Sequence, residues 1–265
     1  MKIGLDFVSP LNLMRQRFLF ASAALSPLTI LNFRKFPRDS ETLRRLVVYS
    51  LINVPAWYAM LVGLVHETSG IASVLTYTQP LFVFCLAIPI LREKMTLSRI
   101  LGTGVGFIGI MFLSVGGVDS FMFSAIASLL LGAFLWAVAI VYYKRYLSRV
   151  DPLIGNFTQL FIGAIIFSIL GFATNDQSFP MNATYLVMIV YVSVGAFSVA
   201  WTIWLVLLRS EDATVVASSS FLVPLGALSL GWVLLAEGIT FQSAFGTALV
   251  LFGVCMVNKS GVRIH

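Results

Sequence analysis

The chain has 265 residues, of which 59% are hydrophobic and only 11% are charged, and its mean hydropathy is +0.96. Soluble domains carry about 25% charged residues, so this composition excludes an ordinary soluble protein and a disordered chain. The chain has only two cysteines, Cys85 and Cys255, which excludes a small disulfide-stabilised protein. Both lie in long apolar stretches, where we expect each thiol to be buried.

Stretches free of Asp, Glu, Lys and Arg are long enough to form membrane-spanning helices. A helix crosses a hydrocarbon core of about 30 Å with about 20 residues. Eight such stretches are residues 46–65, 68–91, 100–118, 120–143, 152–175, 177–208, 213–236 and 238–258. In the long stretch 177–208, Pro180 and Asn182 mark the first part as a loop. The runs are continuously apolar, which favours helices over the alternating strands of a β-barrel.

A ninth span is predicted near the N-terminus. Residues 18–33 are uncharged but too few, and they reach spanning length if the helix begins near Pro10 and contains Arg15 and Arg17 in its first turns. A signal peptide is a poorer interpretation, because the apolar run begins late, lacks a clear cleavage site and is followed by further spans. The sequence therefore predicts an all-α polytopic membrane protein with nine spans.

Basic residues occur in alternate connections between the predicted spans. They are Arg34, Lys35, Arg38, Arg44, Arg45, Arg92, Lys94, Arg99, Lys144, Arg145, Arg149 and Arg209, with Lys259 and Arg263 after the last span. The connections around Glu67, Asp119, Asp176 and Glu237 contain no Lys or Arg. This alternation indicates membrane orientation and not a nucleic-acid surface. By the positive-inside rule, the basic connections and the C-terminus are cytoplasmic, and nine spans put the N-terminus outside.

The second half of the sequence repeats the first. A shift of 144 residues places Trp57 on Trp201, and the shift continues without a gap. The same shift pairs Pro80 with Pro224, Leu81 with Leu225, Glu93 with Glu237, Thr96 with Thr240, Gly102 with Gly246, Thr103 with Thr247 and Gly109 with Gly253. Matches of Trp, Pro, Glu and Gly are informative because these residue types are uncommon or conformationally specific.

The charges do not repeat, which indicates that the halves have opposite orientations. Arg92, Lys94 and Arg99 correspond to uncharged Ala236, Gly238 and Ser243. Antiparallel halves need an odd number of spans in each repeat, as in many secondary transporters. We therefore divide the chain into a first repeat of four spans, residues 1–118, and a second repeat of five, residues 119–265.

The first repeat is one span short. Near its start the register changes by two residues, and Pro10 in Phe-Val-Ser-Pro-Leu matches Pro152 in Arg-Val-Asp-Pro-Leu. The counterpart of the span at residues 120–143 would then precede Met1. We expect that a first transmembrane helix is missing, through a late assignment of the start codon or a true truncation.

The sequence resembles the drug/metabolite transporter superfamily and, within it, the EamA-type permeases. The resemblance covers almost the full length. It rests on the segment from Pro10 to Phe18 that ends in Arg-Phe, on Glu67-Thr-Ser-Gly-Ile-Ala-Ser-Val-Leu running to Pro80-Leu-Phe, on Arg92-Glu-Lys-Met-Thr leading to Gly102 through Gly109, and on their second-half copies. The resemblance implies ten helices in two inverted five-helix repeats, cytoplasmic termini, a central cavity lined by the first four helices of each repeat, and a peripheral fifth helix.

Polar and aromatic side chains within the spans are candidates for a substrate site. Trp57 and Trp201 lie well inside their apolar runs, where an indole would offer stacking area and one N–H donor, although Trp also concentrates at headgroup depth. Further candidates are Asn53, Tyr58, Tyr77, Gln79, Gln159, Thr202, Ser219 and Ser220. Such a wall would suit a small polar or zwitterionic solute. Hydrogen bonding within the bundle is the alternative for each of them.

Two arginines and two prolines have further candidate roles. Arg15 can extend to the headgroups, whereas the deeper Arg17 could bind an anionic group such as a carboxylate. Pro80 and Pro224 interrupt their helices at matching places and are either packing kinks or a symmetric pair of hinges.

Other paired residues are predicted to be structural. We expect Glu93 and Glu237 to end one helix, and Thr96 and Thr240 to cap the start of the next. Gly102, Gly106 and Gly109 form a small-residue face that packs within the bundle or against a second copy in a homodimer.

The sequence favours a secondary transporter over an enzyme. It has two histidines, His66 and His265, and no metal-ligand cluster, phosphate-binding loop or pair of membrane-embedded carboxylates, so we expect no cofactor, metal or nucleic-acid partner. We predict alternating-access transport of a small polar metabolite, such as an amino acid, across the plasma membrane of a prokaryote. The alternatives are a truncated, non-transporting membrane protein and a multidrug-type exporter of the same superfamily.

Overall fold

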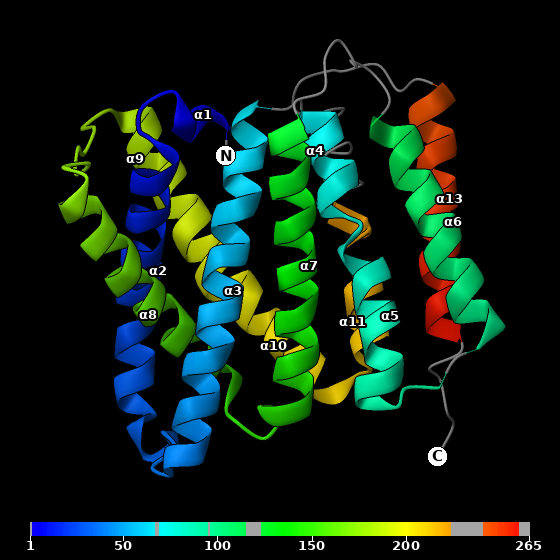
Figure 1. Cartoon of the computed structure of the whole chain (residues 1–265), viewed down its shortest axis with the longest axis horizontal. Coiled ribbons are helices and arrows are strands. Elements are labelled where there is room, and N and C mark those ends of the chain that lie inside the picture. Colours follow the sequence, from blue (N-terminus) through cyan, green and yellow to red (C-terminus); the bar gives the residue numbers. More distant parts are fainter. Residues whose placement is uncertain (1, 67–68, 95, 115–122, 224–240, 260–265) are drawn as a thin grey trace.

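The computed structural model is a bundle of helices joined by short connections (Figure 1). It describes residues 2–66, 69–94, 96–114, 123–223 and 241–259, and no β-strand occurs in these ranges. The helices are α1 (Lys2–Leu5), α2 (Pro10–Leu31), α3 (Ser40–His66), α4 (Ser69–Thr76), α5 (Gln79–Leu91), α6 (Leu97–Ser114), α7 (Phe123–Tyr146), α8 (Pro152–Ala173), α9 (Ala183–Val190), α10 (Trp201–Ser210), α11 (Ala213–Ser219) and α13 (Phe241–Lys259), with a 3₁₀ turn η1 (Phe33–Lys35) and a π-helical segment η2 (Tyr191–Ala200).

The prediction of an all-helical membrane protein is confirmed in its coarse form. Five helical segments of the described residues are long and apolar enough to cross a membrane: Ser40–His66, Val74–Leu91, Phe123–Tyr146, Pro152–Ala173 and Ala183–Ser210. Shorter apolar helices cover Leu97–Phe112 and Ala244–Val257. The total of nine spans stays a prediction.

Local sequence determines where α2 and α8 begin. In α2 the Ser9 side chain accepts a hydrogen bond from Asn12 N at 3.1 Å, and Pro10 is the first helical residue. In α8 the Asp151 side chain accepts from Leu153 N at 3.0 Å, and Pro152 is the first helical residue. A capping oxygen satisfies a free N–H, and proline at the first position has no N–H to satisfy. The prediction that a helix begins near Pro10 is confirmed.

The predicted span at residues 68–91 is split into two helices. α4 ends at Thr76 and α5 begins at Gln79, with Pro80 in its first turn. Proline cannot donate to the carbonyl four residues earlier, which explains why the helix is interrupted at this point. At this break the backbone N–H and the hydroxyl of Thr78 both donate to Leu75 O, at 3.3 and 2.6 Å. In the second half, α11 ends at Ser219 and a turn follows in which Phe221 N donates to Ser218 O at 3.1 Å.

The connections that carry basic residues lie at one end of the bundle. Residues 33–39, 92–94 and 147–151 are at the bottom of Figure 1, as is the end of α10, whose last turn contains Arg209, and we call this the basic end. The connection 174–182 lies at the opposite end (Figure 1). This arrangement agrees with helices that cross the bundle from end to end.

Large apolar side chains cover the outside of the bundle as well as its interior. Examples are Ile169 on α8, Val187 on α9 and Leu251 on α13, all exposed. An exposed apolar surface of this extent suits contact with lipid. Cys85 and Cys255 are exposed on this surface, so the expectation that both thiols are buried is wrong. In a membrane an apolar helix has no reason to turn every apolar residue inward, because lipid solvates these side chains as well as a protein core does.

Glycines bring α6 and α13 into close contact. A Cβ atom at Gly102 would lie 2.7 Å from Gly253 O, and one at Gly109 would lie 2.8 Å from Gly246 O. No side chain fits at these positions, because real Cβ atoms do not approach backbone atoms this closely. The small-residue face therefore packs within the bundle, which was one of the two options that the sequence left open.

This contact predicts opposite effects for two glycines of α6. Gly102→Ala should destabilise the protein by about 1–3 kcal/mol, because the new methyl group meets backbone that cannot yield. Gly104→Ala should be neutral or stabilising by up to about 1 kcal/mol, because nothing lies within 4 Å of its Cβ position and Ala favours the helix. Thermal unfolding of both variants in detergent measures the difference. Equal melting temperatures would contradict the close contact.

Candidate functional site

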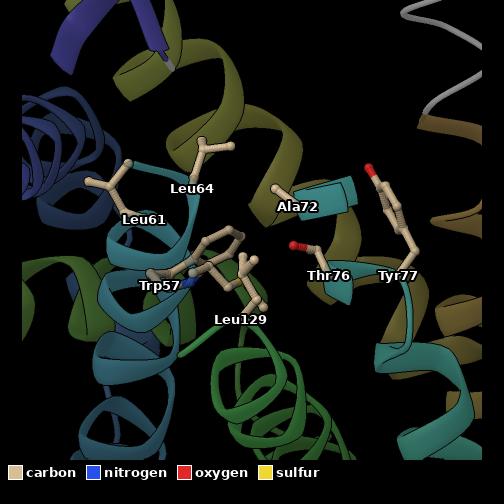
Figure 2. Close-up of a pocket in the computed structure, with 8 residues that line it drawn as sticks. Trp57, Leu61, Leu64, Ala72, Thr76, Tyr77 and Leu129 are labelled. Atoms are coloured by element: carbon tan, nitrogen blue, oxygen red, sulfur yellow. The ribbon is translucent and has the colours of Figure 1, made fainter. Parts of the chain in front are cut away.

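A cavity of about 290 Å³ lies between α3, α4 and α7, toward the end opposite the basic end (Figure 2). Its lining consists of Trp57, Met60, Leu61, Leu64, Ala72, Thr76, Tyr77 and Leu129. Figure 2 shows the Thr76 hydroxyl pointing toward the Trp57 indole. On α3 the lining extends from Trp57 to Leu64, about 10 Å at 1.5 Å per residue, and reaches the last turn of the helix.

A cluster of four tryptophans separates the cavity from the basic end. The Trp57 ring lies 5.1 Å from that of Trp201 and 5.4 Å from that of Trp136, measured between ring centroids. Trp204 stacks on Trp201 with centroids 6.1 Å apart. The indole N–H groups of Trp136 and Trp204 are buried and donate to no described residue. Trp57 therefore lines the cavity, whereas Trp201 packs against Trp57 and is not part of the lining, and a role of either in substrate binding stays a prediction.

The break between α4 and α5 borders the cavity. Thr76 and Tyr77 belong to the lining, and Gln79 follows as the first residue of α5. The Gln79 side chain is fully buried, and among the described residues neither its amide N nor its amide O has a hydrogen-bond partner. A buried amide with no partner is rare and costs roughly 1–3 kcal/mol. Gln79 is thus an unpartnered polar group beside the break, and its role in substrate binding stays a prediction.

Three of the predicted site residues belong to a hydrogen-bonded chain inside the bundle. Asn53 Nδ2 donates to Gln159 Oε1 at 2.5 Å, and Gln159 Nε2 donates to Asn156 Oδ1 at 2.8 Å. Asn156 Nδ2 in turn donates to Thr202 Oγ1 at 2.8 Å. Asn53, Gln159 and Thr202 thus use polar atoms to join α3, α8 and α10, and their role in substrate binding stays a prediction.

Asn156 connects Gln159 to Thr202 in this series of hydrogen bonds, but it was not among the residues predicted from the sequence. Its Nδ2 also lies 2.9 Å from Phe197 O and 3.2 Å from Ser198 O, both in the π-helical segment η2. A π-helix alters the usual pairing of backbone groups, and at membrane depth each carbonyl needs a donor. No sequence signal predicted η2, because nothing in its composition distinguishes it from the α-helix on either side.

None of the other predicted residues that the structure describes belongs to the lining of the cavity. The Arg17 guanidinium is buried on the Phe197 ring, 3.9 Å from its centroid, and Tyr58 packs on Phe167. Ser219 and Ser220 donate to carbonyls of their own turn, at 2.7 Å in each case. Arg15 donates to Asn12 Oδ1 at 2.8 Å and Pro80 is buried in the first turn of α5, while Pro224 lies outside the described residues.

At the basic end, Glu93 joins the two halves of the chain. Its carboxylate accepts hydrogen bonds from Ala213 N at 2.7 Å and from Thr214 N at 3.3 Å, and the Thr214 hydroxyl donates to it at 2.6 Å. Glu93 thus satisfies free N–H groups at the start of α11. We expected Glu93 only to end its own helix, and the structure adds a partner distant in sequence. Thr96 caps α6 as predicted, with its Oγ1 3.3 Å from Arg99 N.

Arg99 reinforces this contact. Its guanidinium donates to Asp212 Oδ2 at 2.6 Å and lies 4.0 Å from Glu93 Oε2. Only 5% of the Arg99 side chain and 7% of the Glu93 side chain are exposed. Nearby, Lys144 Nζ donates to Leu208 O at 2.9 Å and to Glu211 O at 2.7 Å. Arg99 and Lys144 are therefore structural partners as well as orientation signals. We call the contacts of Glu93, Arg99, Asp212, Ala213 and Thr214 the basic-end clasp.

The described residues offer no metal site. No three His, Cys, Asp or Glu side chains gather among them in an arrangement that could hold a metal ion. The chemistry of the cavity is therefore limited, within the described residues, to apolar contact, aromatic stacking and hydrogen bonding.

Asn156→Leu should lower the free energy of unfolding by about 1–3 kcal/mol, because it removes the amide that donates to Phe197 O, to Ser198 O and to the Thr202 hydroxyl and that accepts from Gln159 Nε2. Thr158→Val is the matched control on α8, since the Thr158 hydroxyl donates only to Ile154 O within its own helix, at 2.8 Å. Thermal unfolding in detergent measures both. A melting temperature for Asn156→Leu no lower than that of the control would contradict the assigned role.

Comparisons with known proteins agree on one family. The EamA-like transporter family model matches residues 1–115 and 123–259. The transporter YvbV of Bacillus subtilis (strain 168), described as uncharacterized, is 28% identical over 97% of this chain and 85% of its own. An uncharacterized transporter of Acidianus ambivalens is 30% identical over 95% of this chain and 98% of its own.

A solved structure shares the fold. A protein crystal structure with 15% sequence identity superposes with a TM-score of 0.82, covering 98% of this chain and 91% of that chain. The curated relatives are named transporters and not enzymes. With its long apolar helices and a family match over nearly its full length, this chain is an integral membrane protein that belongs to the EamA-like transporter family.

Proposed function

We propose that this protein is a secondary transporter that moves a small solute by alternating access through the cavity beside the α4–α5 break. One observation carries the proposal: the cavity lies next to a discontinuous helix, with the tryptophan cluster on its side toward the basic end and the clasp at the basic end itself. Discontinuous helices mark substrate sites in transporters, because their free backbone groups are tolerated where they face a cavity.

The proposal includes an inverted relation between residues 1–118 and 119–265. Helix bounds in the two halves correspond at the shift of 144 residues, as for α6 (Leu97–Ser114) and α13 (Phe241–Lys259). These two helices run in opposite directions in Figure 1. Their glycine contacts are reciprocal, since Gly102 meets the counterpart of Gly109 and Gly109 meets the counterpart of Gly102. Such reciprocity is expected of elements related by a twofold axis.

The arrangement supports a state that is closed at the basic end. The basic-end clasp joins α5 and α6 to α11, while the cavity reaches the last turn of α3 at the other end. By the positive-inside rule the basic end is cytoplasmic, as is the C-terminus, so this state faces outward. Inward opening then requires the clasp to separate, and the breaks at Pro80 and after Ser219 are where the helices would bend.

The lining of the cavity favours a solute with an apolar or aromatic part. Trp57 and Tyr77 offer ring faces, Met60, Leu61, Leu64, Ala72 and Leu129 offer apolar contact, and Thr76 offers a hydroxyl. Hydrogen bonds to Thr76, Tyr77 and Gln79 would orient a small polar group. An aromatic or aliphatic amino acid would satisfy this description, although no described lining residue bears a charge for its ammonium or carboxylate group.

The same lining favours a second function, export of apolar compounds by a multidrug-type mechanism. Comparing an amino acid with its uncharged analogue, phenylalanine with 2-phenylethanol, distinguishes the two. Stabilisation of the purified protein against heat by phenylalanine alone supports a metabolite transporter, since a ligand that binds the folded state raises its stability by mass action. Stabilisation by 2-phenylethanol and unrelated apolar compounds supports the exporter.

Filling the cavity should abolish transport without unfolding the protein. Ala72→Phe adds a ring to the buried wall of the cavity, and we expect uptake into vesicles of a solute selected by thermal stabilisation to fall at least about tenfold, because the ring occupies space that the solute needs and each tenfold loss of affinity corresponds to about 1.4 kcal/mol. Leu131→Phe, on the exposed surface of α7, is the control and should retain uptake. Undiminished uptake by Ala72→Phe would remove the cavity from the mechanism.

Loosening the basic-end clasp should open the cytoplasmic side. The reporter is Ala217→Cys, at a buried position of α11, in a chain with Cys85→Ala and Cys255→Ala. Glu93→Gln weakens hydrogen bonds to α11 that are worth about 1–3 kcal/mol, so a maleimide that cannot cross the membrane should label the reporter about tenfold faster in inside-out vesicles.

Glu41→Gln is the matched control for this experiment. Glu41 lies at the same end, but its ion pairs with Arg44 and Arg45 are exposed, and such pairs contribute about 0–1 kcal/mol. We expect its labelling rate to stay within about twofold of the parent. If Glu93→Gln labels no faster than Glu41→Gln, the clasp does not hold the basic end closed.

A further inference from the structure

A second hollow, of about 600 Å³, lies between α5 and α7 near the basic end. Apolar side chains form most of its lining: Leu86, Pro89, Ile90, Val138 and Val141. Tyr142, Tyr146, Arg92 and Arg145 complete it. Both helices end here, α5 at Leu91 and α7 at Tyr146. The hollow therefore combines an apolar groove along two helices with two cations at the helix ends, and we call it the α5–α7 groove.

Neither arginine of the groove forms an ion pair with an acidic side chain in the part of the chain that the structure describes. Of the described residues, none places a carboxylate within ion-pair distance of Arg92 or Arg145, whereas the neighbouring Arg45 pairs with Glu41 at 2.9 Å. Arg145 donates one hydrogen bond to Ile90 O and lies 5.6 Å from the centroid of the Tyr146 ring. A guanidinium has five N–H donors, so this bond leaves most of them for an anion.

Arg92, at the end of α5, has a backbone conformation that is unfavourable for a residue with a side chain. Its φ is 57°, in the left-handed region where glycine is the usual residue and a side chain is strained. Glycine would end α5 with less strain, but it would remove the cation from the groove. The helix dipole alone does not explain an arginine at this strained position, because an arginine in the last helical turn of α5 would interact with the dipole as favourably.

We propose that the α5–α7 groove binds an anionic phospholipid of the leaflet at the basic end. The headgroup phosphate lies between Arg92 and Arg145, and an acyl chain lies along Leu86, Pro89, Val138 and Val141. Charge complementarity selects the headgroup, because phosphate accepts the paired N–H donors of guanidinium and the anionic lipids of a membrane concentrate beside basic ends of helices. Tyr142 and Tyr146 fit the same depth, where aromatic side chains with a polar tip are favoured.

Lipid binding to the purified full-length chain tests the proposal. Dioleoyl phosphatidylglycerol and dioleoyl phosphatidylcholine have the same acyl chains and differ in net charge. Native mass spectrometry across a range of lipid concentrations gives the affinity for each. We expect the parent protein to bind the first phosphatidylglycerol at least about fivefold more tightly than phosphatidylcholine, since each basic side chain near the surface favours an anionic lipid by about this factor.

Variants assign the binding to the groove. Arg92→Gly should weaken phosphatidylglycerol binding about fivefold and, because it relieves backbone strain, should leave the melting temperature in detergent unchanged or higher. Adding Arg145→Gln should bring the loss to about thirtyfold. Arg38→Gln removes an exposed cation from the same end outside the groove. It should change the affinity for phosphatidylglycerol less than about twofold, because salt screens the effect of an exposed charge that does not contact the lipid.

Three results would overturn the proposal. The first is equal affinity of the parent for the two lipids, and the second is an equal loss in Arg38→Gln and Arg92→Gly. The third is displacement of phosphatidylglycerol by glycerol phosphate at millimolar concentration, which would make the site one for a free anion.

Discussion

The need to satisfy backbone hydrogen bonds at membrane depth underlies the irregular features of this fold. Hydrocarbon offers no water to an exposed N–H or C=O, so continuous helices are the default and each departure from them needs a local partner. The Thr78 hydroxyl donates a hydrogen bond to a backbone carbonyl at the break before α5, and the Asn156 amide donates to a carbonyl of the π-helical segment η2. The Glu93 carboxylate accepts from a backbone N–H at the start of α11. The first of these places borders the cavity, the second links helices of the bundle and the third joins the two halves of the chain at the basic end, so the departures coincide with the features that the proposed transport mechanism uses.

Contacts between the halves are made by residues of different chemistry at successive depths. Near the basic end the clasp uses charge, with Glu93 and Arg99 nearly buried against α11. At mid-depth Trp57 meets Trp201, its counterpart in the repeat, ring against ring. α6 and α13 meet through glycines whose backbones touch. Water can replace the hydrogen bonds of the charged contacts, whereas backbones packed through glycines leave no room for water. In the proposed mechanism the clasp therefore opens while the α6–α13 pair stays together.

Polar residues of the spans divide between two uses that the sequence could not separate. Asn53, Gln159 and Thr202 each donate a hydrogen bond to another polar side chain or to the backbone, whereas neither polar atom of the Gln79 amide has a partner among the described residues. All four were predicted on the same ground, as polar groups in an apolar wall. Asn156, which does most to join α8 to η2, was not singled out. A hydrogen-bond partner from another helix cannot be recognised by spacing along the chain, because it depends on how the helices are rotated and packed.

The sequence by itself determined the class of protein, the sites of most helices and the alternation of basic connections. These follow from hydropathy, charge and proline, which act within one helix or at its ends and so need no knowledge of the neighbours. Only the tertiary structure decided that Trp57 lines a cavity while Arg17 packs on Phe197, that Glu93 caps a helix of the other half, and that Arg92 and Arg145 share a groove. Those facts depend on which faces of distant helices meet, and in lipid, where every face of a helix can be apolar, hydropathy does not mark the face that will be buried.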